Sequence, residues 1–276
     1  MRKSFFITVV MVCLFLAQPF FAFSITFAGR GDFYSLELQP GSGSSGVILI
    51  GISDNERYLA YVEVYSPFQE FSEEYRVFAE FFIIDIPRNS YAIKPIPEQV
   101  IVQNSPMDQD CFNFFRYELL SDLMKRARPM LDKFDILPGV LPVRVLPYRE
   151  EGADASKIQS FHLFNGEMGN LAAITLRILK QSQANLLDIR IRSQAAEEME
   201  QVLQKDTKAP AWRASAKDYR IDRTYFYGNS KKYIVVFVEV VFEHDTEKEE
   251  KRYMCVTGEV SKIWDNAFNW SEDMFE

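Results

Sequence analysis

The sequence predicts a mainly β chain of the α+β class, with antiparallel hairpins, one main central helix and a shorter second helix. Three observations predict it. Segments 57–65 and 75–86 have strand-like patterns on either side of a polar loop, apolar segments at 231–242 and 252–260 flank a charged turn, and a long stretch after residue 108 has helical spacing. Sandwich-like and partial propeller-like arrangements of the sheets both fit this pattern.

The first hairpins follow from alternation and turn residues. Residues 33–39 and 47–52 have strand length, and 57–65 alternates cleanly. One face of that segment carries Leu59, Tyr61, Glu63 and Tyr65. A polar loop at 66–74 leads to the strand 75–86, and Pro87-Arg88-Asn89-Ser90 turns the chain again.

The main helix is expected to begin at Asp108 or Asp110, which can cap it. Its apolar residues recur at helical spacing: Phe112, Phe115, Leu119, Leu123 and Met124. Pro129 is expected to stop or kink it. The shorter helix is expected from Ser193 to about Gln204.

The second half of the chain returns to strands. We expect strands at 158–164, 171–180, 186–192, 231–242 and 252–260. Residues 150–155 are expected to form a polar loop, so a weak internal boundary near 148–156 is possible within a single domain at 25–276.

Residues 1–24 have the order of a signal peptide. Arg2 and Lys3 precede an apolar run at 5–16, and Ala22-Phe23-Ser24 is a small-residue cleavage site. Cleavage is expected after Ser24, with Ala28 as the alternative; an uncleaved membrane anchor is the other interpretation. The protein is therefore expected to be secreted or periplasmic.

Charge excludes some partners. The chain has a net charge of −8, and removing Arg2 and Lys3 with the signal leaves about −10. An acidic domain is a poor binder of nucleic acid and anionic lipid. No later segment approaches the length of a membrane span, so the mature protein is not expected to cross a membrane.

Two cysteines remain after the signal, Cys111 and Cys255. In an oxidising compartment they could form one disulfide, and two buried thiols are the equal alternative. Without close cysteine pairs, and with only His162 and His244, no metal site is expected. No cofactor is expected either: the glycine-rich stretch 41–46 matches a dinucleotide motif as text, but it precedes a strand rather than a helix.

Glu63 and Glu239 are the candidate catalytic residues. Each lies among Val, Tyr and Phe on a long predicted strand, where burial would raise the carboxyl pKa. Two such groups across a cleft could hydrolyse a glycosidic bond in an envelope or extracellular polymer. The competing interpretation is that each faces water on a half-exposed sheet.

The favoured function is binding rather than catalysis. No serine-hydrolase elbow is present. Aromatic residues that can be exposed and that suit recognition occur on the predicted strand 57–65 and in the loop after it. Tyr61 and Tyr65 are the candidate binding residues, with Phe68 and Phe71 nearby. The expected partner is an envelope or extracellular protein, or a small ligand.

Three segments carry a family resemblance: Gly51-Ile52-Ser53-Asp54-Asn55-Glu56-Arg57-Tyr58-Leu59-Ala60-Tyr61, Phe82-Ile83-Ile84-Asp85-Ile86-Pro87-Arg88-Asn89-Ser90-Tyr91, and Lys251-Arg252-Tyr253-Met254-Cys255-Val256-Thr257-Gly258. They resemble strands of a bacterial family of predicted secreted proteins known only as a domain of unknown function. Asp54-Asn55-Glu56 stands where that family has Pro-Asp-Gly. The resemblance implies secretion and a β-rich fold, and it implies no catalytic residue.

Overall fold

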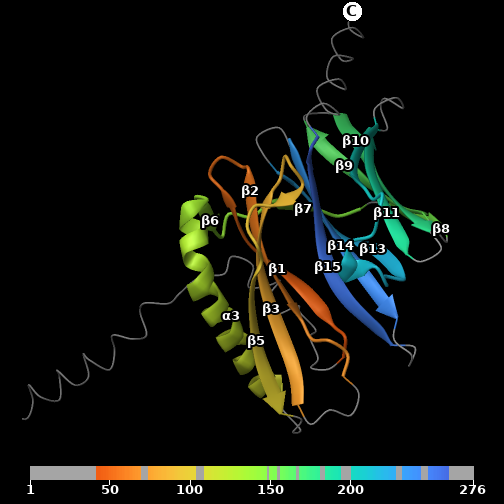
Figure 1. Ribbon diagram of the computed structural model, residues 1–276. Helices are drawn as coiled ribbons and strands as arrows, with labels where there is room; N and C mark the ends of the chain where they lie inside the picture. The colour runs from red at the N-terminus through yellow and green to blue at the C-terminus, as the bar shows by residue number, and fades with distance from the viewer. Residues whose placement is uncertain are drawn as a thin grey trace, which may run out of the picture.

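The fold is seen in a computed structural model of the chain (Figure 1). The structure describes residues 42–69, 74–103, 109–147, 149–153, 156–165, 168–180, 184–193, 200–227, 232–243 and 248–260. The predicted signal peptide at 1–24, the predicted strand at 33–39 and the last 16 residues lie outside the described residues.

Sheet A is built from the N-terminal hairpins. Its strands are β1 (Ser45–Ser53), β2 (Tyr58–Tyr65), β3 (Glu74–Asp85), β4 (Ser90–Tyr91), β5 (Ile96–Gln103) and β6 (Ile136–Pro138). The order is β4-β3-β2-β1-β6, with β5 also paired to β3 and all pairings antiparallel. The predicted alternation of β2 therefore divides its side chains between two buried faces.

One face of sheet A is covered by the single described α-helix, α3 (Gln109–Lys133). Leu120, Leu123, Ala127 and Leu131 recur at helical spacing and pack with Val62, Phe81 and their neighbours. The expectation that Pro129 stops the helix is wrong, because the helix continues to Lys133 with Pro129 inside it.

The other face of sheet A packs on sheet B. The strands of sheet B are β7 (Val143–Val145), β13 (Asp218–Tyr227), β14 (Tyr233–Glu243) and β15 (Glu249–Glu259), in the order β15-β14-β13-β7. Tyr61 and Phe82 from sheet A share a buried cluster with Tyr225 and Phe237 from sheet B. Tyr61 stacks on Phe82 and meets Phe237 edge-on.

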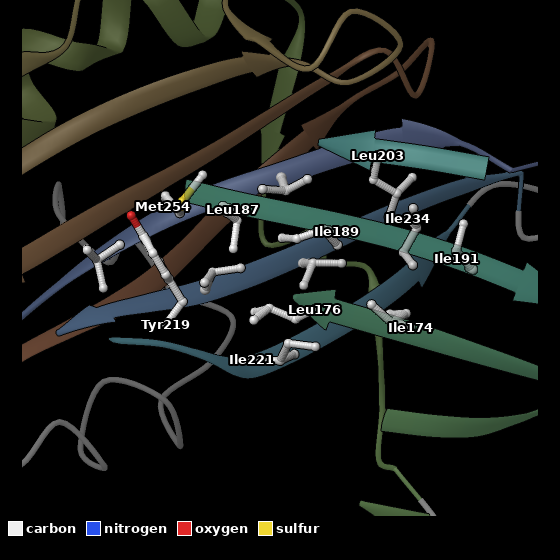
Figure 2. Packing of buried hydrophobic residues seen from close by; sticks show 14 of the residues in the cluster. Ile174, Leu176, Leu187, Ile189, Ile191, Leu203, Tyr219, Ile221, Ile234 and Met254 are labelled. Carbon is white, nitrogen blue, oxygen red and sulfur yellow. The ribbon is translucent and has the colours of Figure 1, made fainter. Parts of the chain in front are cut away.

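Sheet C covers the far face of sheet B. Its strands are β8 (Arg149–Ala153), β9 (Ser156–Asn165), β10 (Met168–Lys180), β11 (Asn185–Ser193) and β12 (Glu200–Lys205), in the order β12-β11-β10-β9-β8. Figure 2 shows the aliphatic layer between the two sheets, with Ile189 and Leu176 facing Ile221 and Ile234. The helix and the three sheets thus follow one another across the molecule (Figure 1).

The connector after α3 adds one short strand to each of the three sheets. β6 pairs with β1 in sheet A, β7 with β13 in sheet B, and β8 with β9 in sheet C. The polar loop expected at 150–155 is therefore wrong over residues 150–153, which belong to β8. Pairing to the edges of three sheets stabilises strands too short to be recognised from their own sequence.

The prediction of a mainly antiparallel β chain with a central helix is confirmed. The prediction of a second helix is wrong for residues 200–204, which belong to β12 and pair with β11. Residues 194–199 of the predicted helix lie outside the described residues. Leu203 enters the core between sheets B and C, so packing overrides the helical propensity of this stretch. None of the helices in the described part of the chain is both long and apolar enough to cross a bilayer.

Candidate functional site

A cleft of about 560 Å³ opens between sheets A and B, beside the 3-10 helix η1 (Ala211–Arg213). Its described lining combines acidic and aromatic side chains with one arginine: Glu63, Glu80, Phe82, Tyr91, Pro95, Trp212, Ser215, Phe242, Glu243, Glu250, Arg252 and Tyr253. We call it the acidic cleft.

Glu63 lies at the inner end of the acidic cleft, on the face of β2 that packs against sheet B, and is 1% exposed. Its Oε1 accepts hydrogen bonds from Ser45 Oγ (3.0 Å), the Tyr253 amide (2.7 Å) and Arg252 Nε (3.0 Å). Arg252 Nη2 donates to Oε2 at 3.2 Å. The buried carboxylate therefore meets a charged and two neutral donors, as burial of a charge requires.

The Arg252 guanidinium is enclosed by sheet A. Besides Glu63 it donates to Glu80 Oε2 (3.1 Å), and its central carbon lies 3.4 Å from the centroid of the Tyr65 ring. The Tyr65 hydroxyl donates to Glu80 Oε1 at 3.3 Å. Glu63 and Glu80 stand opposite each other on β2 and β3. Two carboxylates and an aromatic face thus surround one cation.

Burial and charge compete in this network. Burial raises the pKa of Glu63, while Arg252, the Tyr253 amide and Ser45 act against the rise. Burial acts to lower the pKa of Arg252, but Glu63 and Glu80 outweigh it and raise that pKa. Burial also raises the pKa of Tyr65. The tyrosine and the arginine therefore keep their protons at neutral pH.

One of these contacts, together with two others, protects the outer edge of sheet B. β15 is an edge strand, and alternate N–H groups along it point away from β14. The Lys251 amide donates to the Gly43 carbonyl, the Tyr253 amide to Glu63 and the Thr257 amide to Asn89 Oδ1. Groups of sheet A thus occupy an edge that would otherwise be open to pairing with another chain.

Two aromatic residues form the outer walls of the cleft. Tyr91, on β4, is 49% exposed, and Trp212, on η1, is 45% exposed. Trp212 is held outward because its neighbour Arg213 is buried and bonded to Asp206 at 2.7 and 2.8 Å. Large aromatics left half-exposed beside a cleft are typical of recognition sites.

The two predicted catalytic residues lie in different surroundings in the structure. Glu63 lines the acidic cleft, whereas Glu239 on β14 is not among the described lining residues. Glu239 forms ion pairs with Arg220 (3.4 Å) and Lys251 (3.3 Å) instead. The carboxylate that the fold brings opposite Glu63 is Glu80.

The predicted binding tyrosines lie inside the molecule. Tyr61 is 1% exposed and Tyr65 8%, because this face of β2 packs on sheet B. The expectation of an exposed aromatic face at these positions is therefore wrong, although Tyr65 contacts the arginine of the cleft. Phe68 is half-buried and Phe71 lies outside the described residues.

Cys255 is a free thiol on β15, partly buried against the cluster between sheets A and B, and Cys111 lies in α3. The disulfide between them stays a prediction. His162 lies in β9 and His244 outside the described residues. In the described part of the chain no cluster of His, Cys, Asp and Glu is arranged to hold a metal ion.

Sequence reasoning missed Glu80, Tyr91, Trp212 and Arg252. Glu80 carried the signal that singled out Glu63, a carboxylate within an apolar strand. Arg252 directly follows a charged turn and was indistinguishable from the charges of that turn. Tyr91 and Trp212 come from short elements whose position depends on tertiary contacts.

Comparison with known proteins gives one match. A model of the family described as predicted secreted protein (DUF2259) matches residues 73–259, from β3 to β15. Neither the curated proteins nor the solved structures contain a match. The matched region covers more than half of the chain and includes most of the acidic cleft. The chain belongs to this family of predicted secreted proteins (DUF2259).

Proposed function

We propose that the protein is an exported binding module that takes an organic cation, such as an amine, into the acidic cleft. The observation that carries the proposal is the lining. Among its described residues four are glutamates (Glu63, Glu80, Glu243 and Glu250) and one is cationic (Arg252), while Tyr91 and Trp212 form exposed walls. The signal peptide predicted at residues 1–24 and the description of the family both support export.

The charge of the cleft favours cations. Arg252 is shared between Glu63 and Glu80, and Lys217 reaches Glu243 from outside the lining at 3.0 Å. Glu63, Glu80 and Glu243 thus share two described cations, and Glu250 accepts a hydrogen bond from the Phe68 amide at 3.2 Å. The described lining itself holds four carboxylates and one guanidinium, an excess of negative charge. The net charge of the whole chain, −8, has the same sign and would raise the local concentration of a cationic ligand.

The aromatic walls suit the same ligand. An ammonium group over a Tyr or Trp face gains roughly 0.5–2 kcal/mol, more as water is excluded. The protein uses this contact internally, with Arg252 over Tyr65 at 3.4 Å. Tyr91 and Trp212 line the cleft and are about half exposed, so a ligand in the cleft can reach their rings.

The alternative is a hydrolase of envelope or extracellular polymers, now with Glu63 and Glu80 as the carboxylate pair. Their opposed positions and the raised pKa of Glu63 favour it. Binding accounts better for Glu63, since its two oxygens already accept four hydrogen bonds within the protein and neither faces the cleft unengaged.

Calorimetric titration with spermidine, and with glutarate as a flexible linear anion, tests the proposal. We expect spermidine to bind and glutarate not to bind. Trp212→Ala and Tyr91→Ala should each weaken binding by roughly 3- to 30-fold. Tyr117→Ala is the matched control, because Tyr117 is 53% exposed on α3, away from the lining. Equal affinity in all four proteins would contradict the proposal, as would turnover of a polymer that Glu80→Gln abolishes.

A further inference from the structure

Both aromatic walls of the acidic cleft are connected to the same short segment of sheet C. Asn89 lies in the β3–β4 turn, two residues before Tyr91, with a left-handed φ of 48°. Its side-chain amide donates to the Leu203 carbonyl (3.1 Å) and to Gln204 Oε1 (2.9 Å). Its Oδ1 accepts from the Thr257 amide at 2.8 Å. One asparagine of sheet A therefore contacts sheets B and C.

The connection continues from Gln204 to the other wall. Gln204 Nε2 donates to Asp206 Oδ1 at 2.8 Å, and Asp206 accepts two hydrogen bonds from the Arg213 guanidinium at 2.7 and 2.8 Å. Asp206 also accepts from the Leu187 amide at 2.9 Å. Arg213 is 2% exposed and directly follows Trp212. Asn89, Gln204, Asp206 and Arg213 thus form a chain of hydrogen bonds between the walls, which we call the amide chain.

The chemistry of its ends fixes the direction of this chain. A backbone amide can only donate and an ionised carboxylate can only accept. The Thr257 amide therefore requires the carbonyl of Asn89, and Asp206 requires the NH₂ group of Gln204. Each side-chain amide is left with one orientation, in which Asn89 donates to Gln204. Such a chain holds its members in one arrangement, and losing the Gln204 link removes one restraint from Asn89 and one from Asp206.

We propose that Gln204 is a positioning residue that couples the two aromatic walls, so that Tyr91 and Trp212 are fixed before a ligand arrives. The consequence for affinity rests on the proposed function, whereas the coupling itself does not. Walls that are already ordered lose less side-chain entropy on binding, so pre-organisation strengthens the complex. The side-chain hydrogen bonds of Gln204 go to Asn89 and Asp206, and it acts through these two residues.

The test uses Trp212 as its own reporter, in the full chain with Trp264→Phe and Trp270→Phe. Acrylamide quenching and anisotropy of Trp212 are measured without ligand, far below the unfolding transition. Gln204→Leu removes both hydrogen bonds while keeping the size of the side chain. Gln201→Leu is the matched control: Gln201 is on the same strand, but its amide donates to the Glu259 carbonyl.

A second variant, at Asn89, perturbs the amide chain from the side of Tyr91. Asn89→Gly removes the carboxamide and tolerates the left-handed φ, so the turn can be retained. Asn89 is not in η1, and Asn89→Gly shares with Gln204→Leu the loss of the Asn89–Gln204 hydrogen bond. An effect on Trp212 in both variants therefore points to the amide chain. This variant also guards against a Gln204→Leu protein that fails to fold.

We expect Gln204→Leu and Asn89→Gly to raise Trp212 quenching by about 1.5- to 2-fold and to weaken spermidine binding by about 5-fold, the equivalent of one hydrogen bond. Gln201→Leu should change neither. Trp212 quenching and anisotropy that are unaltered in both variants would overturn the coupling. If Trp212 is loosened but even the unsubstituted protein ignores spermidine, the coupling stands and the proposed ligand is wrong.

Discussion

Glu63 and Arg252 join sheets A and B by a two-point ion pair, with Nε–Oε1 at 3.0 Å and Nη2–Oε2 at 3.2 Å. The carboxylate is 1% exposed and the guanidinium side chain 22%. The pair also connects the inner end of the acidic cleft to the edge of β15, since the Tyr253 amide shares the same oxygen. Cleft chemistry and sheet packing therefore depend on the same two residues.

Arg252→Met is predicted to destabilise the protein by about 3–5 kcal/mol, because it leaves Glu63 buried without its counter-charge. Guanidinium chloride unfolding at pH 7 measures this. Repeating it near pH 4.5 should give a smaller loss, since Glu63 can then take up a proton. The double variant Glu63→Gln/Arg252→Met should recover part of the stability.

Lys251→Met provides the comparison for that experiment. Lys251 pairs with Glu239 at 3.3 Å and its side chain is 35% exposed, so its removal should cost about 1 kcal/mol or less. Equal losses of stability in the two variants would contradict a large contribution from the buried Glu63–Arg252 pair.

The long strands were predictable because their signals are local. Alternation in 57–65 and apolar runs in 231–242 and 252–260 correspond to β2, β14 and β15, and the hairpin of β10 and β11 also agrees with the prediction. Helical spacing located α3. Each of these elements buries enough of its own side chains to show the period in the sequence.

The remaining elements depend on partners far away in the chain. β6 and β7 have three residues each and exist through pairing to β1 and β13. The site was half predictable for the same reason. Glu63 stands out as a charge in an apolar strand, but Arg252, 189 positions later, is recognisable only once sheets A and B are stacked. Tyr61 was expected to be exposed because one face of an isolated hairpin would be in contact with water.

The Asp206–Arg213 pair predicts a loss of stability in acid. Burial acts to raise the pKa of Asp206, but the hydrogen bonds from Arg213, Gln204 and the Leu187 amide prevail and lower it. The unfolded chain then binds a proton more readily, with a pKa of about 3.9. The contribution of ionised Asp206 to folding stability is complete above about pH 4. It is lost as the pH falls through the pKa of Asp206 in the folded protein.

Thermal unfolding of the wild-type protein and Asp206→Asn between pH 2.5 and 7 checks this. We expect the stability difference between them to be largest at neutral pH and to shrink below about pH 4. A difference that is constant down to pH 2.5 would show that Asp206 does not stabilise the fold through its charge.

Gly51 is predicted to be intolerant of a side chain. It lies at the irregularity of β1, where a Cβ would come within 2.2 Å of the Leu137 carbonyl oxygen on β6. Gly51→Ala should therefore push β6 away and cost about 1–3 kcal/mol in unfolding free energy. Gly152→Ala on β8, where the nearest atom is 3.1 Å away, should cost less. Equal losses would contradict a specific contact between β1 and β6.

Cys255 is predicted to react slowly with thiol reagents in the folded protein. Burial raises its pKa, so little thiolate is present at pH 8, and its neighbours across the sheet interface restrict access. In a Cys13→Ser/Cys111→Ser variant it is the remaining cysteine, and Ellman's reagent should modify it far faster in 6 M guanidinium chloride than in buffer. In the exported wild-type protein, no titratable thiol after denaturation would instead establish the Cys111–Cys255 disulfide. Two thiols would exclude it and leave both cysteines as packing residues.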